Sequence, residues 1–235
     1  MFEIIEDDNK SVFFTSYTTV MSIVTSDAWI SNAMQMLMQT STELYNHTIN
    51  VALLTSCIVR EDEKRSYDPY QVVLGALLHD IGYAGTINKS RGKPVDEMTD
   101  MEKLLFDNHI RLGIDYVEKY TSSQIVKDII AMHHEYLDGS GLPAHLDSDH
   151  IPKHVRIITV VNEFVNQISN ETQRFSLDSL SNTKGKMNAL IKNGKIDAEI
   201  LEVLYKRFGE ISGLLESIKS FFYFNEEIYK VFPYT

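Results

Sequence analysis

The segment Tyr70–Ile81 restricts the fold of this chain more than any other feature. It is almost wholly apolar, it follows Asp68-Pro69, and it stops at Gly82. A proline in the first turn and a glycine just past the last turn are typical of a helix, and a helix that is apolar on all sides must be buried. The segment therefore predicts a central helix, and the last turn of this helix carries two polar residues, His79 and Asp80.

Apolar residues at helical spacing recur through most of the chain after residue 27. We expect further helices at Ala28–Met38, Ser41–Arg60, 99–120, 123–132, 152–168 and 198–219. Thr99 and Glu102 form a capping-box pattern at the start of one of them. Strand signals are scarce, so the predicted fold class is all-α, with helices also at the C-terminal end.

Residues 1–26 differ from the rest because β-branched and aromatic residues flank a polar stretch, Asp7–Ser11. This composition predicts a short N-terminal mixed α/β segment, either a small hairpin or an irregular lead-in. The segment could be the remnant of a regulatory domain. Residues 27–235 are then expected to form one helical domain. Its aromatic end, Phe221–Phe224, is either a dimer surface or a tail docked on the core.

The composition indicates in which cellular environment the protein folds. The chain has 235 residues and is 43% hydrophobic, so it can bury a hydrophobic core without the support of disulfides. Its single cysteine, Cys57, lies in an apolar helical stripe and has no partner for an internal disulfide. No apolar run reaches the roughly 20 residues of a membrane helix, and the N-terminus is acidic where a signal peptide is basic. We therefore expect a cytoplasmic protein outside the membrane.

The charge balance argues against one class of partner. There are 22 Lys and Arg against 33 Asp and Glu, a net charge of −11. No basic stripe exists that could follow a nucleic-acid polymer. If the substrate carries phosphate, the positive field must come from a few local cations or from bound metal.

Histidines and one aspartate carry the strongest chemical signal. Five of the eight histidines fall at helix ends or within helices, beside carboxylates: His47, His79, His109, His133 and His134. Asp80 ends an apolar helix, where an unpaired carboxylate would cost several kcal/mol and a cation would neutralise it. Imidazole and carboxylate without thiolate suit iron, manganese, zinc or nickel, and Asp80 could bridge two ions. Glu43 lies four residues before His47 and would share its helix face.

A structural interpretation competes for each single histidine, because a lone histidine on an apolar face is usually a core residue. It does not explain His79 beside Asp80 together with His133 beside His134. The remaining three are expected at the surface, within or after the loop that follows: His145, His150 and His154.

An ordered set of motifs over about residues 40–170 resembles the HD-GYP family. The set comprises His47, His79-Asp80-Ile81-Gly82, Thr99 and Glu102, His109, His133-His134-Glu135, Asp138-Gly-Ser-Gly-Leu-Pro143, His150-Ile-Pro152 and Arg156-Ile-Ile158. The resemblance implies a helical bundle of the HD phosphohydrolase superfamily with two or three divalent metal ions, iron first and manganese next. It also implies hydrolysis of cyclic di-GMP by a metal-bridging hydroxide.

The resemblance assigns roles to particular residues. The implied metal ligands are His47, His79, Asp80, His109, His133 and His134, with Glu43 as a ligand of a third ion. Asp80 would bridge two ions and orient the hydroxide, which makes it the implied catalytic residue.

Four departures from the family pattern bear on function. Tyr83 replaces a lysine, Leu142 replaces the tyrosine of Gly-Tyr-Pro, Asn162 replaces an acidic ligand, and Glu171 replaces a basic residue. Asn162 would be a weak metal ligand because its amide has no charge. Each lost charge-assisted hydrogen bond to phosphate removes about 1.5 to 3 kcal/mol. The candidate substrate contacts are Tyr83, Lys89, Arg91, Lys93 and Arg174, although a run of loop cations is usually solvated surface.

Three functions stay open at this point. The first is a metal-dependent phosphodiesterase acting on cyclic di-GMP or a related small phosphoester, with altered substrate recognition. The second is a catalytically weak, metal-binding HD-GYP module that works as a nucleotide sensor or as an adaptor, with protein signalling partners or as a homodimer. The third is a purely structural helical domain.

Overall fold

A computed structural model describes residues 2–62, 65–84, 99–171 and 177–212. The elements are α1 (Phe2–Ser26), α2 (Ala28–Thr40), α3 (Thr42–Glu61), α4 (Pro69–Leu78), the 3-10 turn η1 (Ile81–Tyr83), α5 (Asp100–Val117), α6 (Gln124–Met132), α7 (Lys153–Glu171), α8 (Leu177–Lys192) and α9 (Ala198–Ser212). Within these ranges the only β pairing is an isolated bridge between Asp138 and Asp147. The predicted all-α class is confirmed.

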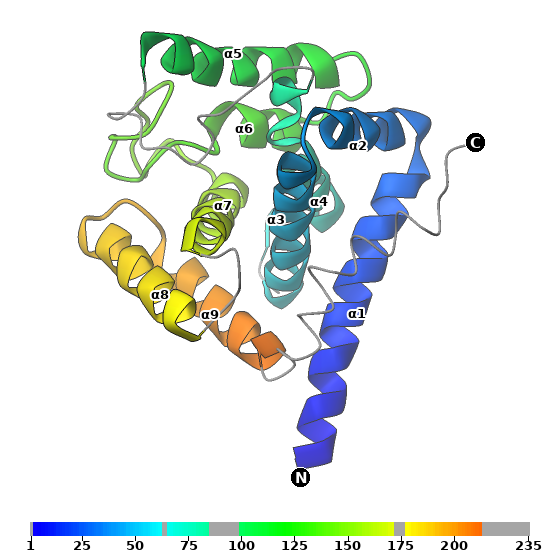
Figure 1. Ribbon diagram of the computed structural model, residues 1–235, viewed down its shortest axis with the longest axis vertical. Coiled ribbons are helices and arrows are strands. Elements are labelled where there is room, and N and C mark those ends of the chain that lie inside the picture. The colour runs from blue at the N-terminus through cyan, green and yellow to red at the C-terminus, as the bar shows by residue number, and fades with distance from the viewer. Residues whose placement is uncertain (1, 63–64, 85–98, 172–176, 213–235) are drawn as a thin grey trace.

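The helices pack around α3 and α4, which lie side by side in the middle of the molecule (Figure 1). Helix α6 packs on α4, and α5 packs on η1. Helix α7 lies against α3 and connects it to α8 and α9, while α1 runs along another side of α3. The ends of α4 and α6 and the middle of α5 therefore meet at one end of α3.

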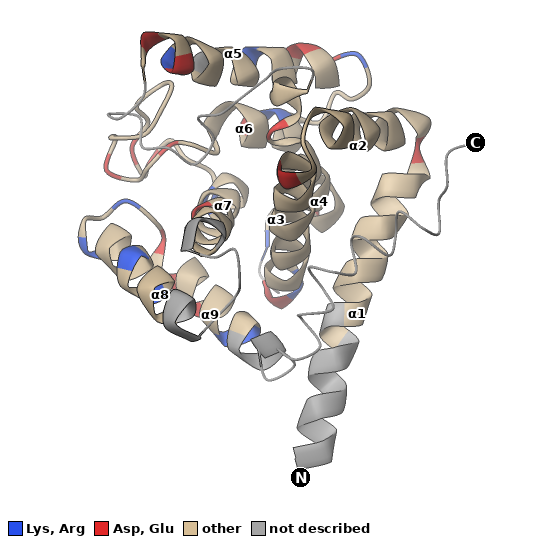
Figure 2. Ribbon diagram, viewed as in Figure 1, with Lys and Arg blue, Asp and Glu red and all other residues tan. Residues whose placement is uncertain are grey.

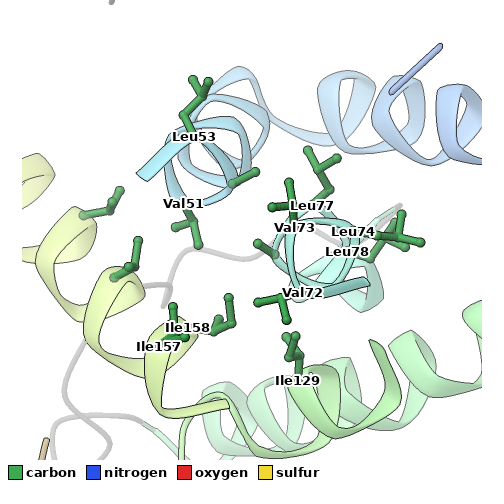
Figure 3. Close-up of a cluster of buried hydrophobic side chains, with 14 of the residues drawn as sticks. Val51, Leu53, Val72, Val73, Leu74, Leu77, Leu78, Ile129, Ile157 and Ile158 are labelled. Carbon is green, nitrogen blue, oxygen red and sulfur yellow. The ribbon is translucent and has the colours of Figure 1, made fainter. Parts of the chain in front are cut away.

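Apolar side chains from four helices converge where α3, α4, α6 and α7 meet. Val51 of α3 faces Ile157 and Ile158 of α7, and Val72 of α4 lies above Ile129 of α6 (Figure 3). All five are at most 1% exposed. Burying one such side chain contributes about 1.5 to 3 kcal/mol, so this contact holds the four helices together. Helices α2 and α4 carry no charged residue, as Figure 2 shows.

The predicted helix starts follow the expected chemistry. The carboxylate of Asp68 accepts a hydrogen bond from the Tyr70 amide before α4, and Ser123 caps α6. The Thr99–Glu102 capping box is present at α5. Cys57 is buried, as its apolar stripe predicts. None of the described helices is long and apolar enough to cross a membrane.

The expected N-terminal mixed α/β segment, either a small hairpin or an irregular lead-in, is wrong, because residues 2–26 form one helix, α1. Ser16, Val20 and Ile23 recur at helical spacing and are at most 1% exposed. Burial of this face outweighs the β propensity of the surrounding residues. Thr19 and Thr25 donate their hydroxyl protons to carbonyl oxygens one turn earlier, which satisfies these polar groups inside the helix.

Helix α8 was also not predicted, because the sequence after Asn170 is mostly polar. Only one narrow side of α8 is buried, and it includes Thr183 and Met187. Helix α4 ends at Leu78, three residues earlier than predicted, and a turn then leads into η1. His79 and Asp80 therefore lie in the turn after the helix rather than within it.

Candidate metal centre

Asp80 lies at the centre of a buried cluster of histidines. Its Oδ2 atom is 3.4 Å from Nε2 of His79 and 3.9 Å from Nε2 of His47. Its Oδ1 atom is 3.6 Å from Nε2 of His133 and 3.9 Å from Nε2 of His109. The side chains come from α3, the end of α4, the middle of α5 and the end of α6. Each carboxylate oxygen thus faces a different pair of imidazoles.

The cluster forms two groups that share Asp80. One group is His47, His79 and Asp80, and the other is Asp80, His109, His133 and His134. In each group the nitrogen and oxygen atoms that could bind an ion lie within 4.8 Å of one another. The structure therefore brings together the six residues predicted as principal metal ligands. A carboxylate with two oxygens in two such groups can bridge two cations.

Backbone carbonyls orient the imidazole rings. Nδ1 of His79 lies 2.7 Å from the Ala76 carbonyl oxygen, and Nδ1 of His133 lies 3.1 Å from that of Ile129. Nδ1 of His109 is similarly paired with the carbonyl of Phe106. A carbonyl oxygen only accepts, so each Nδ1 donates a proton and each Nε2 of a neutral ring keeps its lone pair. Histidines that bind metals are held in this way.

Three of these nitrogen atoms fit a cation. Nε2 of His109, His133 and His134 is buried and has no hydrogen-bond partner. Buried polar atoms without a partner are rare in proteins. Although His134 as a whole residue is partly exposed, its Nε2 atom is buried. Lone pairs of nitrogen beside a carboxylate are the donor set of iron, manganese and zinc sites, so these residues fit a metal ion.

The pKa values favour the forms that bind metal. Burial lowers the pKa of His109 to about 3, and it also lowers the pKa of His133 and of His134. These rings therefore stay neutral at neutral pH. Burial acts to raise the pKa of Asp80, but the surrounding histidines, His79 first, outweigh it and hold that pKa well below its usual value. Asp80 is ionised, and it is the one negative charge at the centre of the cluster.

Gly82 determines how closely η1 approaches α5. A Cβ atom at this position would overlap the backbone carbonyl of His109. Only glycine allows the two backbones to lie this close. The contact brings His109 next to the turn that carries Asp80. The glycine of the His-Asp-Ile-Gly motif thus has a direct role in forming the cluster.

Glu135 organises the loop after His133 and His134. Its carboxylate is 1% exposed and accepts hydrogen bonds from the amides of Ala144 and Leu146, at 2.6 and 3.0 Å. A Cβ atom at Gly141 would overlap the backbone of Glu135 and Tyr136, so the loop folds tightly onto the end of α6. Glu135 has no predicted role in the sequence beyond its place in the His133-His134-Glu135 motif. Its position directly after two predicted ligands was the available signal.

Lys195, in the turn between α8 and α9, fastens the same loop from the other side. Its carbonyl oxygen accepts from the Leu137 amide at 2.9 Å, and its Nζ donates to Oγ of Ser140 at 2.9 Å. The Nζ atom also lies 4.8 Å from the ring centroid of Tyr136. The loop that follows the two histidines is therefore tied to the C-terminal helices.

The other predicted site residues lie in different surroundings. Tyr83 is 3% exposed and its ring stacks on that of His109. Asn162 is 2% exposed on α7, and its Oδ1 accepts from Asn166 at 3.4 Å. Glu43 is exposed in the first turn of α3 and belongs to neither group. Lys89, Arg91, Lys93, Arg174 and the aromatic end Phe221–Phe224 lie outside the described residues.

Of the three histidines expected at the surface, two are exposed and one is half-buried. His145 and His150 are exposed, which confirms the prediction for them. His154 is half-buried, and its Nε2 lies 3.3 Å from a carboxylate oxygen of Asp128, so the prediction is wrong there. The pair joins α6 to the first turn of α7. The sequence does not show that these two helices approach each other at that point.

The structure is a helical bundle in which imidazoles surround one shared aspartate, a side-chain set that could hold metal ions. The chain belongs to the HD domain family, whose model matches residues 31–200. It is 30% identical over 118 residues to 3'3'-cGAMP-specific phosphodiesterase 3 of Vibrio cholerae, covering 50% of this chain and 25% of that protein. It is 30% identical over 129 residues to a cyclic di-GMP phosphodiesterase of Thermotoga maritima, covering 54% of this chain and 35% of that protein.

A solved structure extends the likeness to the fold. An HDG"Y"P protein from Bdellovibrio bacteriovorus superposes with a TM-score of 0.57 at 19% identity, covering 88% of this chain and 67% of that one. The resemblance to HD-GYP proteins that the motifs indicate is confirmed. The matches span a quarter to about a third of the two curated relatives.

Proposed function

We propose that this protein is a metal-dependent phosphodiesterase of the HD-GYP type that hydrolyses cyclic dinucleotides. The observation that carries the proposal is the pair of ligand groups joined by Asp80. The names of the two curated relatives support the substrate class, since one acts on 3'3'-cGAMP and the other on cyclic di-GMP. The cytoplasmic location stays a prediction.

The metal set that we propose is two divalent ions, iron first and manganese second, with a third ion only if Glu43 takes part. His47, His79 and Asp80 would hold one ion, and Asp80, His109, His133 and His134 the other. Bound there, the ions would lower the pKa of a water molecule and neutralise charge on the phosphate. Asn162 is proposed as a weak additional ligand through its carbonyl oxygen.

The protein orients the imidazole rings and buries them away from water. Carbonyl oxygens on three Nδ1 atoms hold the rings so that their Nε2 atoms converge on Asp80. The ionised Asp80 is placed to orient the attacking water. We propose Lys89, Arg91, Lys93 and Arg174 as the cations that contact the phosphates. This assignment supplies the positive charge that an acidic chain otherwise lacks.

A turnover assay tests the proposal. The purified protein would be reconstituted with Fe(II) or Mn(II) under reducing conditions and given cyclic di-GMP, 3'3'-cGAMP and a chromogenic phosphodiester. We expect metal-dependent release of the linear dinucleotide from at least one cyclic substrate, and release at least about 100-fold slower from the Asp80→Asn variant. No product from any substrate, with metal bound, would contradict the enzyme proposal.

A second candidate is the metal-binding module that senses a nucleotide or acts as an adaptor. Tyr83 favours it, because a buried ring occupies a position where the resemblance calls for a phosphate-binding lysine. Calorimetry with the same cyclic dinucleotides separates the two candidates. Binding without turnover supports the sensor, and turnover rejects it.

A further inference from the structure

The ring of Tyr83 lies flat on the ring of His109. Their centroids are 4.1 Å apart and the two planes differ by 13°. Both side chains are buried, with Tyr83 3% and His109 1% exposed. Phe106 approaches His109 edge-on, at 5.3 Å and 67°, and its ring centroid is also 4.5 Å from that of His134. Two aromatic residues therefore pack against His109, a member of the second ligand group.

This packing restrains the tilt of the His109 ring. The hydrogen bond from Nδ1 to the Phe106 carbonyl restrains one edge of the ring, but the plane could still tilt about that bond. A flat stack restrains this tilt, because aromatic rings favour an offset parallel contact. The Nε2 atom then points at Oδ1 of Asp80, 3.9 Å away.

The backbone places Tyr83 close enough to His109 for the two rings to stack. Gly82 lies against the carbonyl oxygen of His109, so the next residue, Tyr83, is placed beside the same turn of α5. A lysine there could not form a flat contact with an imidazole ring. The aromatic residue thus matches the place that the motif glycine creates.

We propose that Tyr83 is a positioning residue that orients His109 for metal binding, rather than a contact of the substrate. The inference rests on the proposed function, because it requires that the second ligand group holds an ion. It explains how a tyrosine, rather than the lysine of the family pattern, could serve the metal centre at position 83. It also distinguishes the two ligand groups, since the ring on which Tyr83 stacks, His109, belongs to the second group.

Metal titration of three proteins tests the inference. Wild type, Tyr83→Phe and Tyr83→Leu would be stripped with chelator and titrated with Mn(II) and Co(II), with stoichiometry from elemental analysis and the Co(II) absorption spectrum as a second readout. We expect two ions in wild type and in Tyr83→Phe, which keeps the stack. In Tyr83→Leu we expect one site to weaken about 10- to 100-fold, as for other residues that orient metal ligands.

A matched control accounts for the cavity that Tyr83→Leu creates. Phe164 is 1% exposed on α7 and packs on Tyr205 and Phe208, away from the cluster. Phe164→Leu removes a similar volume, so it should lower the thermal midpoint and leave both metal affinities unchanged. Circular dichroism of all variants would establish that each is folded.

The outcomes separate this inference from the proposed function. Two ions bound to Tyr83→Leu with wild-type affinity would overturn the positioning role and leave the metal centre standing. Equal loss in Tyr83→Phe and Tyr83→Leu would also overturn it, since the hydroxyl group rather than the stack would then matter. Failure of wild type to bind any ion would reject the metal centre and the inference together.

Discussion

Oδ2 of Asp80 lies 3.4 Å from Nε2 of His79, the residue that precedes it in the chain. The other oxygen of the same carboxylate faces His133, at 3.6 Å. One side chain therefore belongs to both ligand groups. Loss of its charge should affect both groups together, whereas loss of any one histidine should affect only its own.

The first prediction follows from this sharing. Asp80→Asn keeps the size of the side chain but removes the negative charge between the imidazoles. We expect the metal content to fall from two ions to less than one, and metal-dependent hydrolysis to fall by at least about 100-fold. Elemental analysis and the turnover assay measure these effects. Asp147→Asn, at an exposed carboxylate, is the control and should keep both ions. A full metal content in Asp80→Asn would reject the bridging role.

The second prediction compares two glycines. Gly82→Ala places a Cβ against the His109 carbonyl, while a Cβ at Gly185 in α8 meets nothing within 4 Å. We expect Gly82→Ala to lower the free energy of unfolding by several kcal/mol and to lower metal affinity, because η1 must move away from α5. Gly185→Ala should raise the free energy of unfolding by roughly 0.5 to 1 kcal/mol. Urea unfolding of both variants measures the difference, and similar values for the two would contradict the close approach.

The third prediction concerns the pH dependence of the metal-free protein. The pKa of His109 is about 3 in the folded protein against 6.5 for an ordinary histidine. Between these pH values the unfolded chain binds a proton that the folded chain does not. The free energy of unfolding therefore has its full value above pH 6.5 and decreases as the pH falls toward 3. Each unit of pKa difference corresponds to about 1.4 kcal/mol.

Urea unfolding at several pH values between 7.5 and 4.5, after chelator treatment, measures this loss. The lowered pKa of His133 and of His134 has the same sign and should steepen the dependence. His109→Gln removes one titrating group and should flatten it. A free energy of unfolding that stays constant over this range would show that the imidazoles are not buried in their neutral form.

The fourth prediction restores a carboxylate. Asn162→Asp adds negative charge at a buried position of α7 where the resemblance implies an acidic ligand. We expect Mn(II) to bind about 10-fold tighter, equivalent to about 1.4 kcal/mol. The metal-free variant should be less stable, because the new charge is buried. Calorimetric titration measures the affinity, and an unchanged value would place residue 162 outside the metal centre.

Much of the fold could be predicted because local signals are strong where the core is apolar. The stretch from Val72 to Leu78, the capping box at Thr99 and the caps at Asp68 and Ser123 all lie where the sequence places them. Helix α1 was missed because its threonines and aromatic residues favour strands locally. Its packing against α3, α2 and α9 favours the helix, and a single sequence does not show those contacts.

The centre could be predicted in its composition but not in its arrangement. Spacing and family resemblance select His47, Asp80 and His133, and the structure brings them together. They do not show that Asp80 lies beyond the end of α4, that Glu135 holds the loop after His134, or that Tyr83 is stacked and buried. Each of these depends on contacts between residues distant in the chain, so no local pattern records it.

The attachment of Lys195 to the loop after α6 has a mechanical consequence. Three contacts join the α8–α9 turn to Tyr136, Leu137 and Ser140, a few residues beyond His133. A displacement of the α8–α9 turn would have to break these contacts or move the loop with it. The position of the loop after His134 therefore depends on the position of the α8–α9 turn as well as on α6.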